Sequence, residues 1–305
     1  MVDLNYHMRQ ALDIDEEKNQ KVLEKFSKYS KNGDIFLCIV APYAGIKITP
    51  SKEITASIGF SEEFGIESFI EAAKAKLKDS NTKENSLYLL INSPGGLVQS
   101  SYKVSRALRN SFKKIIVFVP HIAASGGTLT ALAGNEIVMG MMSQLSPLDP
   151  SSGNMEALKI ARGFATLTDF FSKIQEDDAP YNYKALADKY SAADIDDATA
   201  NLELMKRYTK EILQGSGYVE PECEKISERL VKGCLDHSEV INMDHAKEIG
   251  LNVVPNTSYP ELWETFRDWL EEYVLKSADK HIIRYWVNID SGEANGEKAK
   301  DAKKK

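Results

Sequence analysis

The fold of this chain is decided by residues 114–140, which read KIIVFVPHIAASGGTLTALAGNEIVMG. They begin with a short, continuous apolar run typical of a buried strand, pass through a glycine-rich turn, and continue as an apolar helix before a second buried run. Residues 86–96, SLYLLINSPGG, follow the same plan of an apolar run and a glycine turn ahead of a helix. Strands alternating with helical stretches of about 10–15 residues predict right-handed βαβ units and a mainly parallel sheet.

Outward from these two stretches, the pattern predicts one α/β domain with a helical elaboration. The helix after residue 96 is expected to turn Val98, Tyr102, Val104 and Leu108 toward the core. The apolar runs of these stretches give expected strands at 86–92, 114–120 and 136–140. We expect further strands at 34–42, in the segment DHSEVIN (236–242) and at the end of AKEIGLNVV, and helices at 62–79, 155–175, 182–190, 195–214, 220–232, in MDHAKEIG (243–250) and at 260–276. The expected division is a helical N-terminal extension at 1–33, the α/β domain at 34–258, a helix and strand-like segment at 259–290, and a disordered tail at 291–305.

Bulk composition excludes several classes of protein. The 305 residues are 43% apolar and 27% charged, with a net charge of −7, so a hydrophobic core is expected and a basic nucleic-acid-binding face is not. Three cysteines without a CxxC motif indicate buried thiols in a reducing compartment, and no regular metal-ligand spacing occurs. No apolar run reaches the ~20 residues that span a bilayer, so we expect a soluble, cytoplasmic protein with no membrane span, metal or cofactor.

Two glycine-rich turns are the candidates for chemistry. Ser93-Pro94-Gly95-Gly96 could present backbone N–H groups to an oxyanion, or could simply form a tight βα turn. Ser125 in AASGG lies at a strand-to-helix junction, where it could act as a nucleophile or merely cap the helix. Neighbouring parallel strands would bring both turns to one carboxyl edge, where ligands of α/β sheets bind. An oxyanion donor from one turn and a nucleophile from the other are what acyl transfer requires.

These motifs together resemble the ClpP/crotonase superfamily, and the serine dehydrogenase proteinase family within it. The resemblance rests on SPGG, on PHIAASGGTLTALAGNEIVMG (120–140), on LSPLDPS (145–151) and on AKEIGLNV (246–253), within residues 86–265. It implies a ClpP/crotonase-like fold and a serine protease. Ser146 stands where the family usually has glycine, and DHSEVIN replaces a more usual HDYP-like string.

The resemblance also implies a catalytic triad in the chain order Ser, Asp, His. Ser125 would be the nucleophile, Asp149 the acid and His237 the general base, with oxyanion donors from the N–H of Gly95 or Gly96 and that of Gly126. His7, His245 and His281 are expected at the surface, and His121 is an alternative base four residues before Ser125. A Ser–Lys dyad, as in the related signal-peptide peptidases, would draw its base from Lys184 or Lys173.

The functional expectation is hydrolysis of peptide bonds in a peptide or protein substrate, by a homo-oligomer. Two alternatives stay open: a crotonase-type enzyme acting on acyl-CoA thioesters, and a catalytically silent ClpP-like interaction module. The sequence names neither the natural substrate, the oligomer size nor a partner ATPase. It also leaves open whether the protein is active alone.

Overall fold

A six-stranded sheet forms the centre of the molecule, with strand order β11-β7-β5-β4-β1-β12. The computed structural model describes residues 16–31, 33–41, 47–49, 52–53, 57–79, 85–152, 155–174, 178, 180–187, 189, 191–276 and 282–287. Adjacent strands run parallel from β11 to β1, whereas β12 pairs antiparallel with β1 at the edge. The expected mainly parallel α/β fold is therefore confirmed. The strands of the sheet are β1 (Ile35–Val40), β4 (Ser86–Asn92), β5 (Lys114–Val119), β7 (Glu136–Met139), β11 (Val253–Pro255) and β12 (Ile282–Val287).

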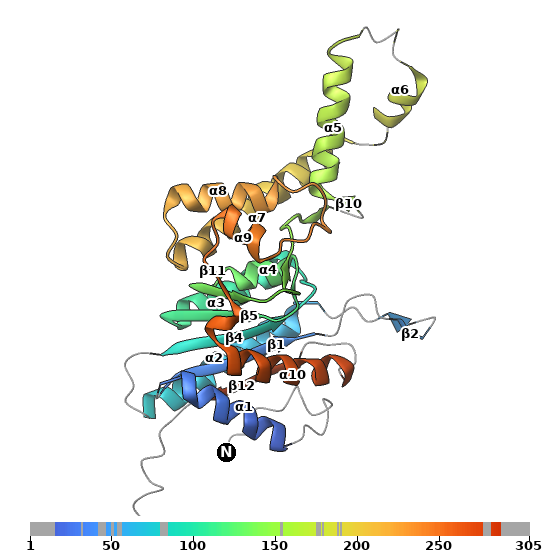
Figure 1. The fold of residues 1–305 in the computed structure, drawn as a ribbon. Helices are drawn as coiled ribbons and strands as arrows, with labels where there is room; N and C mark the ends of the chain where they lie inside the picture. Colours follow the sequence, from blue (N-terminus) through green and yellow to red (C-terminus); the bar gives the residue numbers. More distant parts are fainter. Residues whose placement is uncertain are drawn as a thin grey trace, which may run out of the picture.

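Helices cover both faces of this sheet (Figure 1). One face packs against α2 (Phe60–Asp79), α3 (Val98–Ser111) and α4 (Gly126–Ala131) through the alternate strand residues that include Leu89 and Val117. The opposite face, which includes Phe36 and Phe118, packs against Phe26 of α1 (Glu16–Tyr29) and the aromatic side chains of α10 (Pro260–Lys276). Burial on both faces explains why the central strands read as continuous apolar runs.

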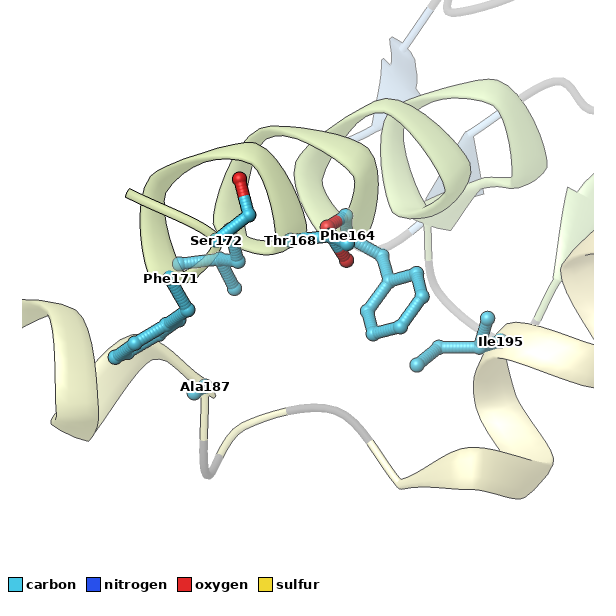
Figure 2. A pocket seen from close by; sticks show the side chains of 7 residues that line it. Phe164, Thr168, Phe171, Ser172, Ala187 and Ile195 are labelled. Atoms are coloured by element: carbon cyan, nitrogen blue, oxygen red, sulfur yellow. The ribbon is translucent and has the colours of Figure 1, made fainter. Parts of the chain in front are cut away.

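A second helical layer covers α3 and α4. It consists of α7 (Ala192–Gly215), α8 (Glu220–Val231) and α9 (Met243–Ile249), while α5 (Ala157–Phe171) and α6 (Tyr181–Ala187) project away from the sheet (Figure 1). Phe170 of α5 stacks on Tyr183 of α6 at a centroid distance of 3.7 Å. Between these helices and α7 lies an apolar cavity of about 440 Å³, toward which Phe164 and Ile195 point (Figure 2).

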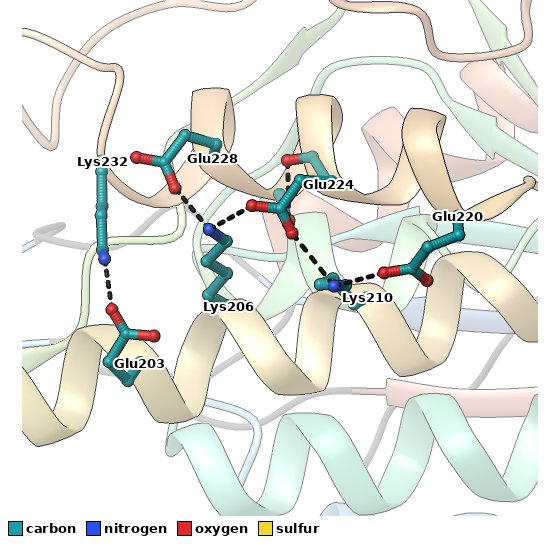
Figure 3. A network of polar contacts seen from close by, with 8 residues as sticks. Glu203, Lys206, Lys210, Glu220, Glu224, Glu228 and Lys232 are labelled. Carbon is teal, nitrogen blue, oxygen red and sulfur yellow. Dashed lines mark hydrogen bonds and ion pairs between the residues drawn. The ribbon is translucent and has the colours of Figure 1, made fainter.

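Ion pairs join α7 to α8 along one side of this layer (Figure 3). Lys206 contacts the carboxylates of Glu224 and Glu228 at 2.6 and 2.7 Å, and its side chain is 17% exposed. Lys232, directly after α8, pairs with Glu203 of α7. These pairs link the C-terminal part of α8 and the residue that follows it to α7.

The remaining strands are short pairs. They are β2 (Lys47–Thr49) with β3 (Lys52–Glu53), β6 (Ile122–Ala123) with β8 (Gln144–Leu145), and β9 (Ser151–Ser152) with β10 (Met155–Glu156); one 3₁₀ turn, η3, spans Asn256–Ser258. The described part of the chain contains no helix long and apolar enough to cross a membrane.

The expected strand in DHSEVIN is wrong. Asp236 accepts hydrogen bonds from the backbone N–H and the hydroxyl of Ser238, which closes a local turn in place of a strand ladder. Within 236–242 only Ile241 makes a bridge, with Leu145. The division into domains stays a prediction, and the expected tail at 291–305 lies outside the described residues.

Candidate active site

The two glycine turns lie against each other at the carboxyl ends of β4 and β5. The backbone N–H of Ser93 donates to the carbonyl of Ile122 at 2.9 Å, and that of Ala124 donates to the carbonyl of Ser93 at 2.9 Å. A Cβ on Gly95 would lie 2.7 Å from the carbonyl oxygen of Ala124 and 2.9 Å from the nitrogen of Gly126, and its φ is +107°. Only glycine fits there, so the SPGG turn is shaped by its contact with the ASGG turn.

Ser125 has a strained backbone. Its φ is 48° and its ψ is −117°, and no other non-glycine residue in the described part of the chain has a positive φ. It stands at the N-cap position of α4, yet its side chain makes no capping hydrogen bond. Its backbone N–H instead donates to Oγ of Ser146 at 2.7 Å. The capping interpretation therefore lacks its hydrogen bond, and strain of this kind gathers at functional sites.

The backbone geometry distinguishes the possible oxyanion donors. The N–H of Gly95 donates to Oγ of Ser93 at 3.1 Å. Gly96 forms a parallel bridge with Ile58 in which the carbonyl of Gly95 and the N–H of Leu97 make the hydrogen bonds, so the N–H of Gly96 points to the other side. Among the described residues, nothing accepts a hydrogen bond from the N–H of Gly96 or of Gly126. A Cβ on Gly126 would lie 3.1 Å from the nitrogen of Gly96, so these two donors are neighbours.

Asp149 is buried beside the start of α5. It is 3% exposed, and its Oδ1 accepts a hydrogen bond from the N–H of Leu158 at 3.0 Å. Burial raises the pKa of this carboxyl, while the hydrogen bond from Leu158 and the charge of His237 act in the opposite direction. Asp149 and His237 are therefore within electrostatic range of each other.

His237 lies half-buried in the turn that replaces the expected strand. Its Nδ1 is buried and has no hydrogen-bond partner among the residues that the structure describes. Its charge also helps to lower the pKa of Glu156, after the hydrogen bonds of that carboxylate to its own backbone and to Lys159. The imidazole thus has two carboxylates nearby, and a buried ring nitrogen open for a hydrogen bond. Catalytic hydrogen bonds of unliganded enzymes often form only when substrate binds.

The alternative bases lie in different surroundings. Lys173 is exposed just beyond α5 and pairs with Asp169 at 2.6 Å, and Lys184 lies on α6, in the projecting part of the molecule (Figure 1). Neither helix end approaches α4 in this structure. His121 lies beside the site, directly before β6, and burial lowers the pKa of its imidazole. The described residues contain no cluster of three or more side chains that could hold a metal ion.

Comparison with known proteins identifies the family of this chain. A family model described as ClpP-like SDH-type serine proteinase matches residues 67–300. The chain belongs to this family. Two uncharacterized proteins of Methanocaldococcus jannaschii are similar to it, at 29% identity over 69% of this chain and 67% of the relative, and at 27% identity over 69% and 64%. The chain thus spans about two thirds of the length of these relatives.

Solved structures of a membrane-bound stomatin-specific protease, 1510-N, also align with this member of the SDH-type family. A serine-to-alanine mutant has a TM-score of 0.40 and 17% identity, covering 65% of this chain and 75% of its own. A lysine-to-alanine mutant in complex with a substrate peptide has a TM-score of 0.40 and 18% identity, covering 67% and 76%.

Three residues of this SDH-type site were missed at the sequence level. In the sequence Ser146 stood out only as a serine where the family usually has glycine, yet its Oγ accepts a hydrogen bond from the backbone N–H of Ser125. Glu156 gave no signal in the sequence, because it lies 81 positions before His237. The hydroxyl of Ser101 on α3 is buried without a partner in the described residues, and a Cβ on Gly126 would lie 2.1 Å from it. That contact explains why position 126 needs glycine.

Proposed function

We propose that this SDH-type protein hydrolyses peptide bonds through an acyl-enzyme on Ser125. The observation that carries the proposal is the strained backbone of Ser125, whose side chain is not used as a helix cap and which lies against two neighbouring backbone N–H groups. Strained nucleophiles on strand-to-helix turns expose their oxygen to substrate, and paired N–H groups stabilise the tetrahedral oxyanion.

The reaction assigns one role to each group. Oγ of Ser125 adds to the carbonyl carbon of the peptide while His237 takes the hydroxyl proton, and the oxyanion accepts hydrogen bonds from Gly96 and Gly126. Breaking of the C–N bond releases the amine, which receives the proton from His237. Water then attacks the ester, again through His237, and returns Ser125 to its hydroxyl form. Asp149 orients the imidazole and stabilises its charged form.

An extended peptide is the substrate that suits a site at a strand edge, because main-chain hydrogen bonds can bind it regardless of its side chains. The parallel bridge between Ile58 and Gly96 already uses one side of the glycine turn in this way. Assembly into a homo-oligomer and a cytoplasmic location remain expectations from the sequence.

Covalent labelling with a fluorophosphonate tests the proposal. We would label the wild type, Ser125→Ala, His237→Gln and, as the matched control, His245→Gln, whose imidazole is exposed on α9. Label mapped to Ser125, lost in the first two variants and retained in the control, supports the assigned roles. Label on Ser125 that survives in His237→Gln moves the base to His121 or a lysine. A folded wild type that takes no label contradicts the hydrolase and favours a thioester enzyme or a silent module.

A further inference from the structure

The segment that carries His237, residues 232–240, is neither helix nor strand, and the residue after it, Ile241, exchanges two backbone hydrogen bonds with Leu145. Three backbone carbonyls of the segment accept hydrogen bonds from the guanidinium of Arg162 on α5. Nη2 donates to the carbonyls of Lys232 and Cys234 at 3.0 and 2.5 Å, and Nη1 donates to that of Leu235 at 3.1 Å. These carbonyls directly follow α8, where the last carbonyls of a helix lack partners within the helix.

Arginine suits this task because its guanidinium is a planar fork that stays charged and can serve several acceptors at once. The other side-chain contacts of the segment are ion pairs, one of which joins Glu239 to Arg229 of α8. Lys159, one turn before Arg162 on α5, pairs with Asp236 at 3.1 Å, but both side chains are 47% exposed. Exposed pairs of this kind contribute little. Lys232 pairs with Glu203 of α7 through its side chain only.

Helix α5 also contacts Asp149, the proposed acid of the triad. The N–H of Leu158, in the first turn of α5, donates to Asp149, and the guanidinium of Arg162 lies one turn further along. Residues 158–162 of α5 thus contact both Asp149 and the segment that carries His237. A shift of about 1 Å in such a group is enough to change a rate by about a hundredfold.

We propose that Arg162 is a positioning residue for the hydrolysis described above: by binding the carbonyls of Lys232, Cys234 and Leu235, it keeps His237 in register with Asp149. This inference rests on the proposed function, because it assigns the purpose of the contact to the base. A purely structural helix-end contact would instead stabilise the fold and leave the chemistry of the folded protein unchanged.

The experiment compares Arg162→Met and Arg162→Lys with Arg109→Met in the full chain. Arg109 is a matched control because its guanidinium also binds backbone carbonyls, those of Phe112, Lys113 and Ala133, between α3 and the strands. Each protein is treated with a fluorophosphonate at several concentrations, which separates the maximal labelling rate at Ser125 from the probe concentration that half-saturates it. Iodoacetamide modification of Cys234, a fully buried thiol in the same segment, reports on the backbone independently of catalysis.

We expect Arg162→Met to lower the maximal labelling rate about ten- to a hundredfold, with the half-saturating concentration unchanged within about twofold. In Arg162→Met, iodoacetamide should alkylate Cys234 at least about tenfold faster than in the wild type, because local opening of the segment exposes this thiol. The alkylation rate of Cys38 serves as the internal reference. Arg162→Lys should recover part of the rate, since an ammonium can serve only some of the carbonyls. Arg109→Met should lower the unfolding temperature and leave both readouts of the folded protein unchanged.

Two results would overturn the role of Arg162 while leaving the hydrolase intact. One is an unchanged labelling rate in Arg162→Met, and the other is a slower rate without faster alkylation of Cys234. A wild type that takes no label at Ser125 refutes the proposed function itself, and the role of Arg162 falls with it.

Discussion

Replacing Ser125 with glycine should stabilise the protein relative to replacing it with alanine. Both substitutions remove the hydroxyl, so they differ only in the backbone that they allow. Alanine must adopt the same φ of 48° and ψ of −117°, a conformation that costs a residue with a Cβ about 1–3 kcal/mol. Glycine adopts it without that cost, but loses about 0.5–1 kcal/mol more through its freedom in the unfolded chain.

The difference leaves Ser125→Gly more stable than Ser125→Ala by up to about 2.5 kcal/mol, from the strain relieved and the entropy lost. At about 2–4 °C per kcal/mol for a domain of this size, the unfolding temperature of Ser125→Gly should be higher by up to about 10 °C. Thermal and urea unfolding, followed by circular dichroism, measure both quantities. Neither variant should react with a fluorophosphonate at this position.

Ser172 is the matched control. It follows α5 with an ordinary φ of −70° and ψ of −16°, so Ser172→Gly should be less stable than Ser172→Ala, by about 0.5–1 kcal/mol. Opposite signs at the two serines identify strain at Ser125. If glycine is the less stable substitution at both positions, Ser125 is unstrained and the argument for its role fails.

Three further predictions concern the surroundings of Ser125. Asp149→Asn should slow labelling of Ser125 about 10²- to 10⁴-fold without loss of stability. Burial raises the pKa of Asp149 in the folded state, so ionisation of this carboxyl lowers the stability of the wild type above that pKa but not below the pKa of the unfolded chain. The free energy of unfolding of Asp149→Asn, relative to that of the wild type, should therefore rise between urea titrations at pH 4 and at pH 8. A relative free energy that falls with pH would contradict this. Ser146→Ala leaves the N–H of Ser125 without its acceptor and should lower the free energy of unfolding by about 1–3 kcal/mol in urea titrations, whereas a neutral result would mean that water replaces the hydroxyl. Burial raises the pKa of the Cys234 thiol to about 11, so native protein at pH 8 should resist iodoacetamide there until urea unfolds it; rapid modification of the folded protein would show that the segment opens readily.

The central sheet was predictable because its strands are buried on both faces. The run at 86–92 became β4 with the same bounds, and the strand expected at 114–120 ends one residue earlier as β5. The meeting of the two glycine turns also followed from the sequence, since parallel neighbours bring their carboxyl ends to one edge. Regular hydrophobic patterns thus predict where the buried strands lie and at which edge of the sheet they end.

Other features depend on contacts that leave no local pattern. The alternation in DHSEVIN resembles a strand, but the side chain of Asp236 binds the backbone two residues on and closes a turn. The φ of 48° at Ser125 cannot be predicted from the residue type, because the packing of the turn imposes that angle. Arg162 binds carbonyls 70 to 73 residues away, and no spacing in the sequence could have indicated it.

The projection of α5 has a mechanical consequence. At a rise of about 1.5 Å per residue, Arg162 lies about 7 Å from the first residue of the helix and Phe171 about 21 Å from it. A tilt of about 10° at the base would move the outer end by about 4 Å and the guanidinium by about 1 Å. A tilt of α5 about its base would therefore displace the guanidinium of Arg162 about a third as far as the outer end of the helix.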